Sequence, residues 1–181
     1  MKLRHLFFAC SGVFVMIFSL LLLVVIVFSD EEDGGSGGNL IYGGVSVSQE
    51  VLAHKPMLEK YAREYGIEEY LNVLLAIIQV ESGGTLEDVM QSSESLGLPP
   101  NSLSTEESIK QGCKYFSELL AAAETKGCDL NSVIQSYNYG GGFLDYVAGR
   151  GKKYTFELAE SFARDKSGGK KVTYTNPVAV E

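Results

Sequence analysis

An apolar run organises this chain, because a helix predicted over Ile67–Glu81 has almost no polar face. A helix that is apolar on nearly all sides is buried inside a domain, whereas a surface helix keeps one polar face. Gly83 and Gly84 follow the run, and glycine just after the last periodic residue is a signal for a helix C-terminus. The pattern therefore predicts a buried central helix that ends with the carboxyl group of Glu81.

Upstream of this helix, apolar positions between Val51 and Tyr65 recur with helical spacing. We expect Ser46 or Ser48 to cap the helix that they form. Pro56 either kinks this helix or begins its main segment, because proline is tolerated only in the first turn.

Downstream, the stretch Gly83–Asn101 has no sustained periodicity and is dense in hydrogen-bonding side chains, which is typical of a functional loop. Ser104 and Glu107 then form a Ser-x-x-Glu capping box that begins another amphipathic helix. Further elements are expected after the caps Asp129 and Thr155, with a short helical turn at 143–147 and a strand at 172–180. The predicted fold class is mostly α, built around one central helix.

The N-terminal segment Leu6–Phe28 contains no charged residue and exceeds the ~20 residues that a helix needs to cross a bilayer core. Basic residues precede it and acidic residues follow it, which places the N-terminus in the cytoplasm. A cleaved signal peptide is the alternative, but Val27-Phe28-Ser29 is a poor cleavage site. The predicted organisation is a cytoplasmic N-terminus (1–5), a transmembrane anchor (6–28), an acidic, glycine-rich linker (29–44) and a folded domain (45–181).

The net charge of the chain is −8, and it becomes −10 when Lys2 and Arg4, which precede the anchor, are set apart. This acidity argues against nucleic acid as a partner. Cys113 and Cys128 follow the anchor and could form a disulfide in an oxidising compartment. We favour a buried free thiol at Cys113, because it lies on the apolar face of a predicted helix. No spacing of histidine and cysteine resembles a zinc site, and neither a metal nor another cofactor is expected.

Chemistry is expected in three segments that follow or end predicted helices, namely 81–84, 88–95 and 136–141. Burial and the partial negative charge of the last helix carbonyls both disfavour a charged Glu81, so we expect its pKa to be raised. A general acid that works near neutral pH needs such a shift. The alternative is an ordinary solvated carboxylate at a helix end.

The motifs Glu-Ser-Gly-Gly (81–84), Met-Gln (90–91) and Tyr-Asn-x-Gly (137–140), in this order and at these separations, resemble the lysozyme-like domain of bacterial cell-wall hydrolases. The chain is similar to soluble lytic transglycosylases and goose-type lysozymes. It is most similar to muramidase domains found beside a cysteine peptidase domain and to their membrane-anchored relatives. The resemblance covers residues 57–162. It implies a monomeric muramidase on the outer side of the membrane that cleaves peptidoglycan between N-acetylmuramic acid and N-acetylglucosamine.

By this resemblance, Glu81 is the catalytic acid and Asp88 is the second carboxylate. Gln91 and the pair Tyr137-Asn138 match positions that line the sugar cleft. Transglycosylases have Gly-Leu ahead of Met-Gln, and the departure to Asp88-Val89 favours hydrolysis, because a carboxylate can orient water. The remaining candidate substrate-binding residues are Ser82, Ser93, Glu94 and Tyr139.

Structural roles remain as alternatives for several of these residues. Asp88 and Glu94 could stabilise the loop, Gln91 could brace it, and Asn138 could cap its helix. Of the two tyrosines at 137 and 139, one is expected in the core and the other against a sugar ring. The alternative functions are a lytic transglycosylase, whose products carry anhydro-muramyl ends, and a non-catalytic glycan-binding module.

Overall fold

The computed structural model describes residues 40–42 and 45–167, and these are mostly helical, as the sequence predicts. None of the described helices has the length and hydropathy that a membrane span requires. The predicted anchor (6–28) and the predicted strand (172–180) lie outside the described residues. The elements in chain order are the strands β1 (Leu40–Tyr42) and β2 (Val45–Val47), the helices α2 (Gln49–Ala53) and α3 (Lys55–Glu64), the 3₁₀ turn η1 (Glu68–Tyr70), the helix α4 (Leu71–Glu81), the 3₁₀ turn η2 (Ser93–Leu96), and the helices α5 (Thr105–Lys126), α6 (Leu130–Tyr139), α7 (Gly142–Ala148) and α8 (Phe156–Lys166).

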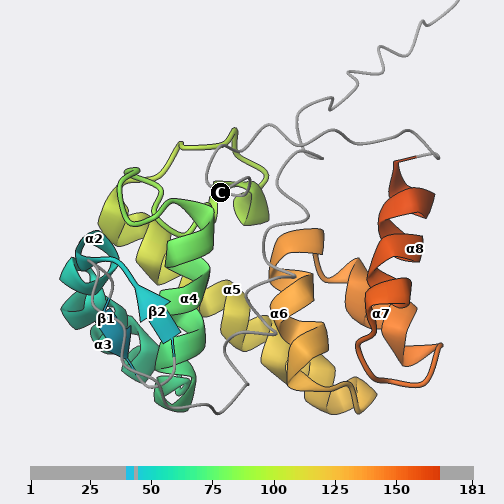
Figure 1. The fold of residues 1–181 in the computed structure, drawn as a ribbon. Coiled ribbons are helices and arrows are strands. Elements are labelled where there is room, and N and C mark those ends of the chain that lie inside the picture. The colour runs from blue at the N-terminus through green and yellow to red at the C-terminus, as the bar shows by residue number, and fades with distance from the viewer. Residues whose placement is uncertain (1–39, 43–44, 168–181) are drawn as a thin grey trace, which may run out of the picture.

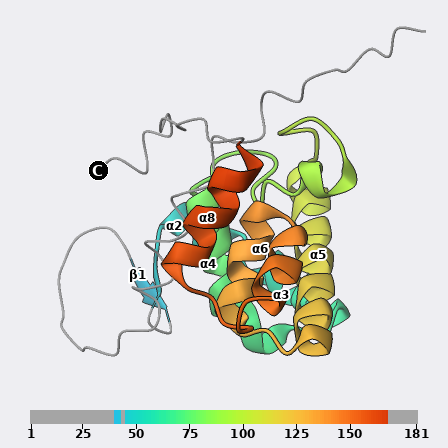
Figure 2. The same cartoon turned by 90° about the vertical axis from the view of Figure 1, so that its right-hand side faces the viewer.

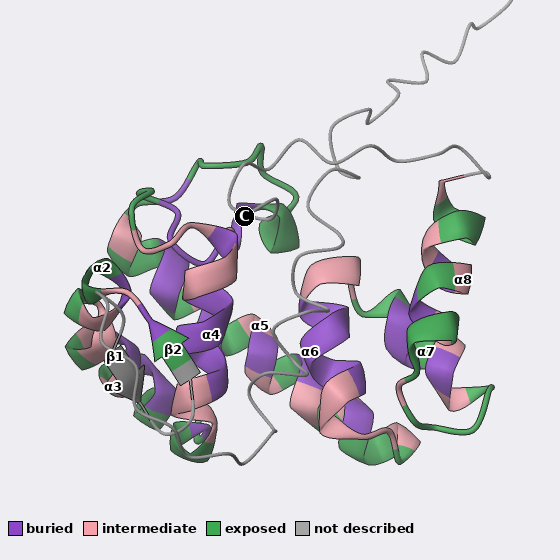
Figure 3. Cartoon of the chain, viewed as in Figure 1, coloured by how far each residue is buried: buried purple, intermediate pink, exposed green. Residues whose placement is uncertain are grey.

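Helix α4 lies in the interior, as its apolar sequence predicts (Figure 3). It contacts α2, α3 and β2. Full burial of an aliphatic side chain stabilises a fold by about 1.5–3 kcal/mol, so α4 contributes much of the hydrophobic free energy of the domain. The expected helix start at Ile67 is replaced by the turn η1, and the regular helix begins at Leu71. The buried residues of α4 are Val73, Leu74, Leu75, Ala76, Ile77, Ile78 and Glu81.

The segment before α4 forms two helices. The sequence had left open whether Pro56 kinks a single helix or begins a second one. The Ser48 hydroxyl accepts a hydrogen bond from the Val51 amide and caps α2. Pro56 lies in the first turn of α3, so it begins the second helix and does not kink a continuous one. Strand β1 pairs antiparallel with β2. This pairing places β1 in a hairpin, although the sequence analysis assigned these residues to a glycine-rich linker.

Helices α5 and α6 begin as predicted. Ser104 and Glu107 form a reciprocal capping box at the start of α5, and Gly127 ends that helix in the left-handed conformation. The Asp129 side chain caps α6 by accepting a hydrogen bond from the Ser132 amide. The two helices pack against each other, and α5 also contacts α3 and α7. Helix α5 therefore links the α4 side of the molecule to the α7 side (Figure 1).

The last two helices have a separate small core. It is formed by Phe143 and Val147 from α7 with Ala159 and Phe162 from α8. Thr155 caps α8 as predicted, by accepting a hydrogen bond from the Leu158 amide. Helix α7 contacts both α6 and α5, so this small core joins the main body through these two helices. The view turned by 90° shows α8 and α6 in front of α4 (Figure 2).

The turn that ends α4 is expected to be sensitive to a single methyl group. Gly84 has a φ of +77°, and a Cβ there would lie 2.7 Å from the backbone carbon of Glu50 and the backbone nitrogen of Val51. Gly97 has a similar φ of +71° but no heavy atom within 4 Å of its Cβ position. We expect Gly97→Ala to cost about 1–2 kcal/mol from backbone strain alone. Gly84→Ala should cost about 1–3 kcal/mol more, because the backbone of α2 must shift. Urea denaturation of both variants measures the difference, and equal losses would contradict it.

Candidate active site

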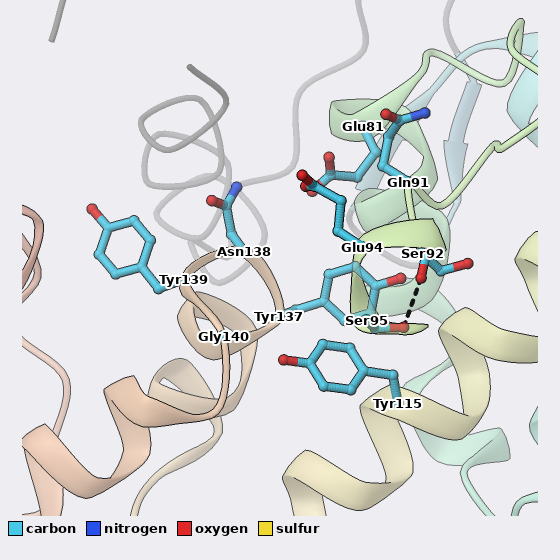
Figure 4. Close-up of a pocket in the computed structure, with 10 residues that line it drawn as sticks. All are labelled: Glu81, Gln91, Ser92, Glu94, Ser95, Tyr115, Tyr137, Asn138, Tyr139 and Gly140. Carbon is cyan, nitrogen blue, oxygen red and sulfur yellow. Dashed lines mark hydrogen bonds between the residues drawn. The ribbon is translucent and has the colours of Figure 1, made fainter. Parts of the chain in front are cut away.

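One cleft, of about 220 Å³, lies between the loop after α4 and the end of α6. Figure 4 shows side chains from both walls turned toward this space. It brings together residues from all three chemistry-bearing segments of the sequence with Tyr115 from α5. The cleft is lined by Glu81, Gln91, Ser92, Glu94, Ser95, Tyr115, Tyr137, Asn138, Tyr139 and Gly140.

Glu81 is the last residue of α4 and is buried. Burial raises the pKa of its carboxyl group from 4.5 to about 8, and the like charges of Glu94 and Asp88 add to the shift. The prediction of a raised pKa is confirmed in direction, with desolvation as the main cause. At neutral pH this side chain therefore holds a proton that it can donate into the cleft.

Glu94 lies in η2, and its carboxyl group is directed toward the same space as that of Glu81 (Figure 4). Its side chain is exposed. Partial desolvation and the charge of Asp88 raise its pKa above the ordinary value. The cleft thus contains two carboxyl groups in different surroundings, one buried and one open to solvent.

Asp88, expected as the second catalytic carboxylate, does not line the cleft. It is fully buried. Its Oδ1 accepts hydrogen bonds from the Ser92 amide at 2.9 Å and the Ser108 hydroxyl at 2.6 Å. Its Oδ2 accepts hydrogen bonds from the amide and the hydroxyl of Ser93. These bonds tie the loop to α5, which matches the loop-stabilising alternative that the sequence left open.

Gln91 lies at the mouth of the cleft with a φ of +46°, which is unusual for a residue other than glycine. Its side-chain amide donates hydrogen bonds to the Asp88 carbonyl at 2.7 Å and to Asn101 Oδ1 at 2.8 Å. Gln91 therefore braces the loop and lines the cleft at the same time. A strained backbone that surrounding contacts hold in place is common at functional sites.

The opposite wall comes from the end of α6. The Tyr137 hydroxyl donates a hydrogen bond to the Met90 carbonyl at 3.0 Å, which joins α6 to the loop. Tyr137 is buried, and burial raises the pKa of its hydroxyl well above the usual value. Tyr139 is half-buried and stacks on Phe162 at 5.7 Å between ring centroids. Of the two tyrosines, Tyr137 is therefore the core residue, and Asn138 lies between them on the cleft wall.

Two of the predicted substrate-binding residues lie outside the cleft lining. The Ser82 hydroxyl donates a hydrogen bond to the Val89 carbonyl at 2.7 Å, which closes the turn after α4. The Ser93 hydroxyl donates to Asp88 and accepts a hydrogen bond from the Ser102 amide. Both hydroxyl groups stabilise the loop.

Four cleft residues were not singled out from the sequence. Ser92, Ser95 and Gly140 lie in segments that the sequence analysis had already identified, so their position beside the candidate residues could have indicated them. Tyr115 gave no such signal, because it comes from α5 and reaches the cleft only through the packing of α5 on α6.

No group of three or more histidine, cysteine, aspartate or glutamate side chains able to hold a metal ion occurs within residues 46–167. Cys113 and Cys128 are both free, and Cys113 is buried. Burial raises the pKa of the Cys113 thiol to about 12. The favoured prediction of a buried free thiol is confirmed.

Residues 48–181 match the family model described as lysozyme-like. The chain belongs to the lysozyme-like family. The match spans all the helices described here, which include α4 with its terminal Glu81 and both walls of the cleft.

Two proteins of Bacillus subtilis are similar to this chain. The bifunctional muramidase/DL-endopeptidase CwlT of Bacillus subtilis is 44% identical over 124 residues, which are 68% of this chain and 37% of CwlT. The membrane protein YocA of the same organism is 38% identical over 121 residues, covering 66% of this chain and 54% of YocA. The chain thus spans about a third to a half of these two relatives.

A solved structure, of a lipoprotein-like member of the NLP/P60 family from Staphylococcus aureus, superimposes with a TM-score of 0.72 at 73% identity. The superposition covers 76% of this chain and 46% of that one.

The buried acid is expected to reduce the stability of the fold at neutral pH. Below pH 4.5, Glu81 is protonated in both the folded and the unfolded chain, so it adds no cost. As the pH rises from 4.5 to about 8, only the unfolded chain ionises it, and the folded state loses relative stability. At about 1.4 kcal/mol per pKa unit, the loss at pH 7 is on the order of 3 kcal/mol.

Glu81→Gln removes this ionisation and should raise the free energy of unfolding at pH 7 by about 2–3 kcal/mol. The difference should nearly vanish at pH 4. Chemical denaturation of the wild type and the variant at both pH values tests this prediction. If the difference in unfolding free energy between the variant and the wild type were the same at pH 4 and pH 7, Glu81 would titrate as an ordinary glutamate.

Proposed function

We propose that this chain is an N-acetylmuramidase that hydrolyses the bond between N-acetylmuramic acid and N-acetylglucosamine in peptidoglycan. The observation that carries the proposal is the buried carboxyl group of Glu81, which faces the cleft with its pKa raised to about 8. A glycosidic oxygen is a poor leaving group until it is protonated, and a carboxylic acid that keeps its proton at neutral pH can supply that proton. Membership of the lysozyme-like family and the muramidase activity in the name of CwlT support the same reaction.

The cleft walls supply groups suited to a sugar chain. Asn138 projects into the cleft from the α6 side, and Gln91 from the loop side (Figure 4). The Gln91 amide nitrogen already donates two hydrogen bonds within the loop, so its amide oxygen is the group that can accept from a sugar hydroxyl. Sugars are bound largely by such neutral hydrogen bonds and by contact with aromatic rings, and Tyr139 provides a ring at the edge of the same wall. An acidic cleft is compatible with this mode of binding.

We place the enzyme on the outer face of the cytoplasmic membrane. The uncharged segment Leu6–Phe28, with basic residues before it and acidic residues after it, supports this orientation. YocA is named a membrane protein, and the similar staphylococcal protein is described as similar to a lipoprotein, so these relatives support membrane attachment. In this position the cleft would meet glycan strands of the wall directly.

Glu81→Gln should abolish cleavage while preserving the fold. Loss of a general acid typically lowers the rate by about 10²–10⁴-fold. The release of reducing ends from purified peptidoglycan measures the rate, and mass spectrometry of the products identifies the bond. Glu87→Gln is the matched control, because Glu87 is exposed and does not line the cleft. Undiminished release by Glu81→Gln would refute the proposal, and anhydro-muramyl ends in the wild-type products would indicate a lytic transglycosylase.

The rate is also expected to fall on the alkaline side. Glu81 must be protonated to act as the acid, and its pKa is raised to about 8. On the alkaline side, the rate should therefore hold up to about pH 8 and decline about tenfold per pH unit above it. Initial rates on soluble glycan fragments between pH 5 and pH 10 test this. A rate that already declines as the pH is raised from 5 to 6 would contradict the assignment of the proton to Glu81.

A further inference from the structure

Besides Glu81, the cleft contains the carboxyl group of Glu94. The hydrogen bonds around Asp88 exclude Asp88 as the second catalytic carboxylate. A carboxylate has about four acceptor positions on its two oxygens. In Asp88 all four are used, by the amide of Ser92, the amide and the hydroxyl of Ser93, and the hydroxyl of Ser108. The side chain is also fully buried. Asp88 therefore has neither a free lone pair nor a path for a water molecule or a sugar.

Glu94 differs from Asp88 in each of these respects. Its side chain is exposed, it lines the cleft, and its carboxyl group points toward that of Glu81 (Figure 4). Among the residues described, no hydrogen-bond donor or cation engages this carboxyl group. It is therefore free to receive a proton from a water molecule held in the cleft.

The position of Glu94 depends on Asp88. Two backbone amides that Asp88 holds, those of Ser92 and Ser93, lie at the start of η2, directly before Glu94. The Ser108 hydroxyl donates to Asp88 and accepts from the Met90 amide, so α5 fixes the loop on its other side. Loss of the Asp88 carboxylate would release the turn that aims Glu94 into the cleft. Asp88 is in this sense a positioning residue.

We propose that Glu94 is the second catalytic carboxylate, the group that accepts the proton of the attacking water, and that Asp88 acts only by holding Glu94 in place. This rests on the muramidase function proposed above. In the reaction, Glu81 gives its proton to the leaving oxygen as the bond from that oxygen to C1 breaks. Water forms the new bond to C1 and gives one proton to Glu94, so one water is added across the glycosidic bond. Proton exchange with solvent then restores both carboxyl groups.

The surroundings of the two groups suit these opposite tasks. Glu81 is buried and Glu94 is exposed, and the negative charge of Asp88 raises the pKa of both carboxyl groups. A buried carboxyl group keeps its proton more readily than an exposed one, because burial disfavours the charged form. Such a pair, with surroundings that separate the two titrations, is the usual arrangement of acid and base in glycoside hydrolysis.

The test compares Glu94→Ala and Glu94→Gln with Asp88→Ala in the full chain, with peptidoglycan fragments as substrate. Both Glu94 variants should keep the wild-type Tm and lose about 10²–10⁴-fold in rate. Asp88→Ala should also lose activity, but with a fall in Tm of about 5 °C or more, because four buried hydrogen-bond donors lose their acceptor.

Sodium azide distinguishes loss of the catalytic base itself from displacement of an intact base. Azide attacks C1 without releasing a proton, so it needs no base and should restore cleavage in Glu94→Ala with a muramyl azide as the product. Asp88→Ala should not be restored. Wild-type activity in Glu94→Ala, azide rescue of Asp88→Ala alone, or no azide product with either variant would each overturn the proposal. Failure of the proposed function is visible separately, as a wild-type chain that does not cleave or that forms anhydro-muramyl ends.

Discussion

The burial of one carboxyl group is the interaction on which the rest of the site depends. Glu81 ends a helix whose other buried residues are aliphatic, and its side chain lines the cleft. Desolvation there disfavours the charged form more than the like charges of its neighbours do. The cost of holding an acid in this position is met by the surrounding core, in which α4 packs against α2, α3 and β2. The same packing that stabilises the domain thus keeps the proton on Glu81.

The loop that follows α4 is held in place by hydrogen bonds from buried side chains. Apart from the 3₁₀ turn η2, the segment between Gly84 and Asn101 has no helix or strand to satisfy its backbone, so its polar groups need other partners. A buried carboxylate, Asp88, and the hydroxyl of Ser108 from α5 provide them. Tyr137 adds a bond from α6 to the Met90 carbonyl. The loop is therefore attached to two helices, and the residues that it directs into the cleft, Gln91 and Glu94, have defined positions.

The cleft walls belong to parts of the molecule with different cores. One wall rests on the large core around α4, and the Tyr139 end of the other rests on the small aromatic core of α7 and α8. Tyr139 belongs to both the cleft and this small core, since it stacks on Phe162. The glycines after Tyr139 begin α7, so the α6 wall leads directly into the second core. A sugar chain in the cleft would contact both parts at once.

The sequence by itself determined the helices, because their signals are local. The apolar faces, the capping box at Ser104, the caps at Asp129 and Thr155, and the position of Glu81 at the end of a buried helix all follow from residues within a few positions of one another. The family motifs added the order of the three segments. Only the tertiary structure decided which polar side chains reach the cleft. Asp88 and Glu94 lie in one loop and are alike in chemistry, but one of the two hydroxyl groups that engage Asp88 comes from Ser108, 20 residues further along. Such a contact leaves no periodic trace in the sequence, so the burial of one carboxylate and the exposure of the other could be read only from the folded chain.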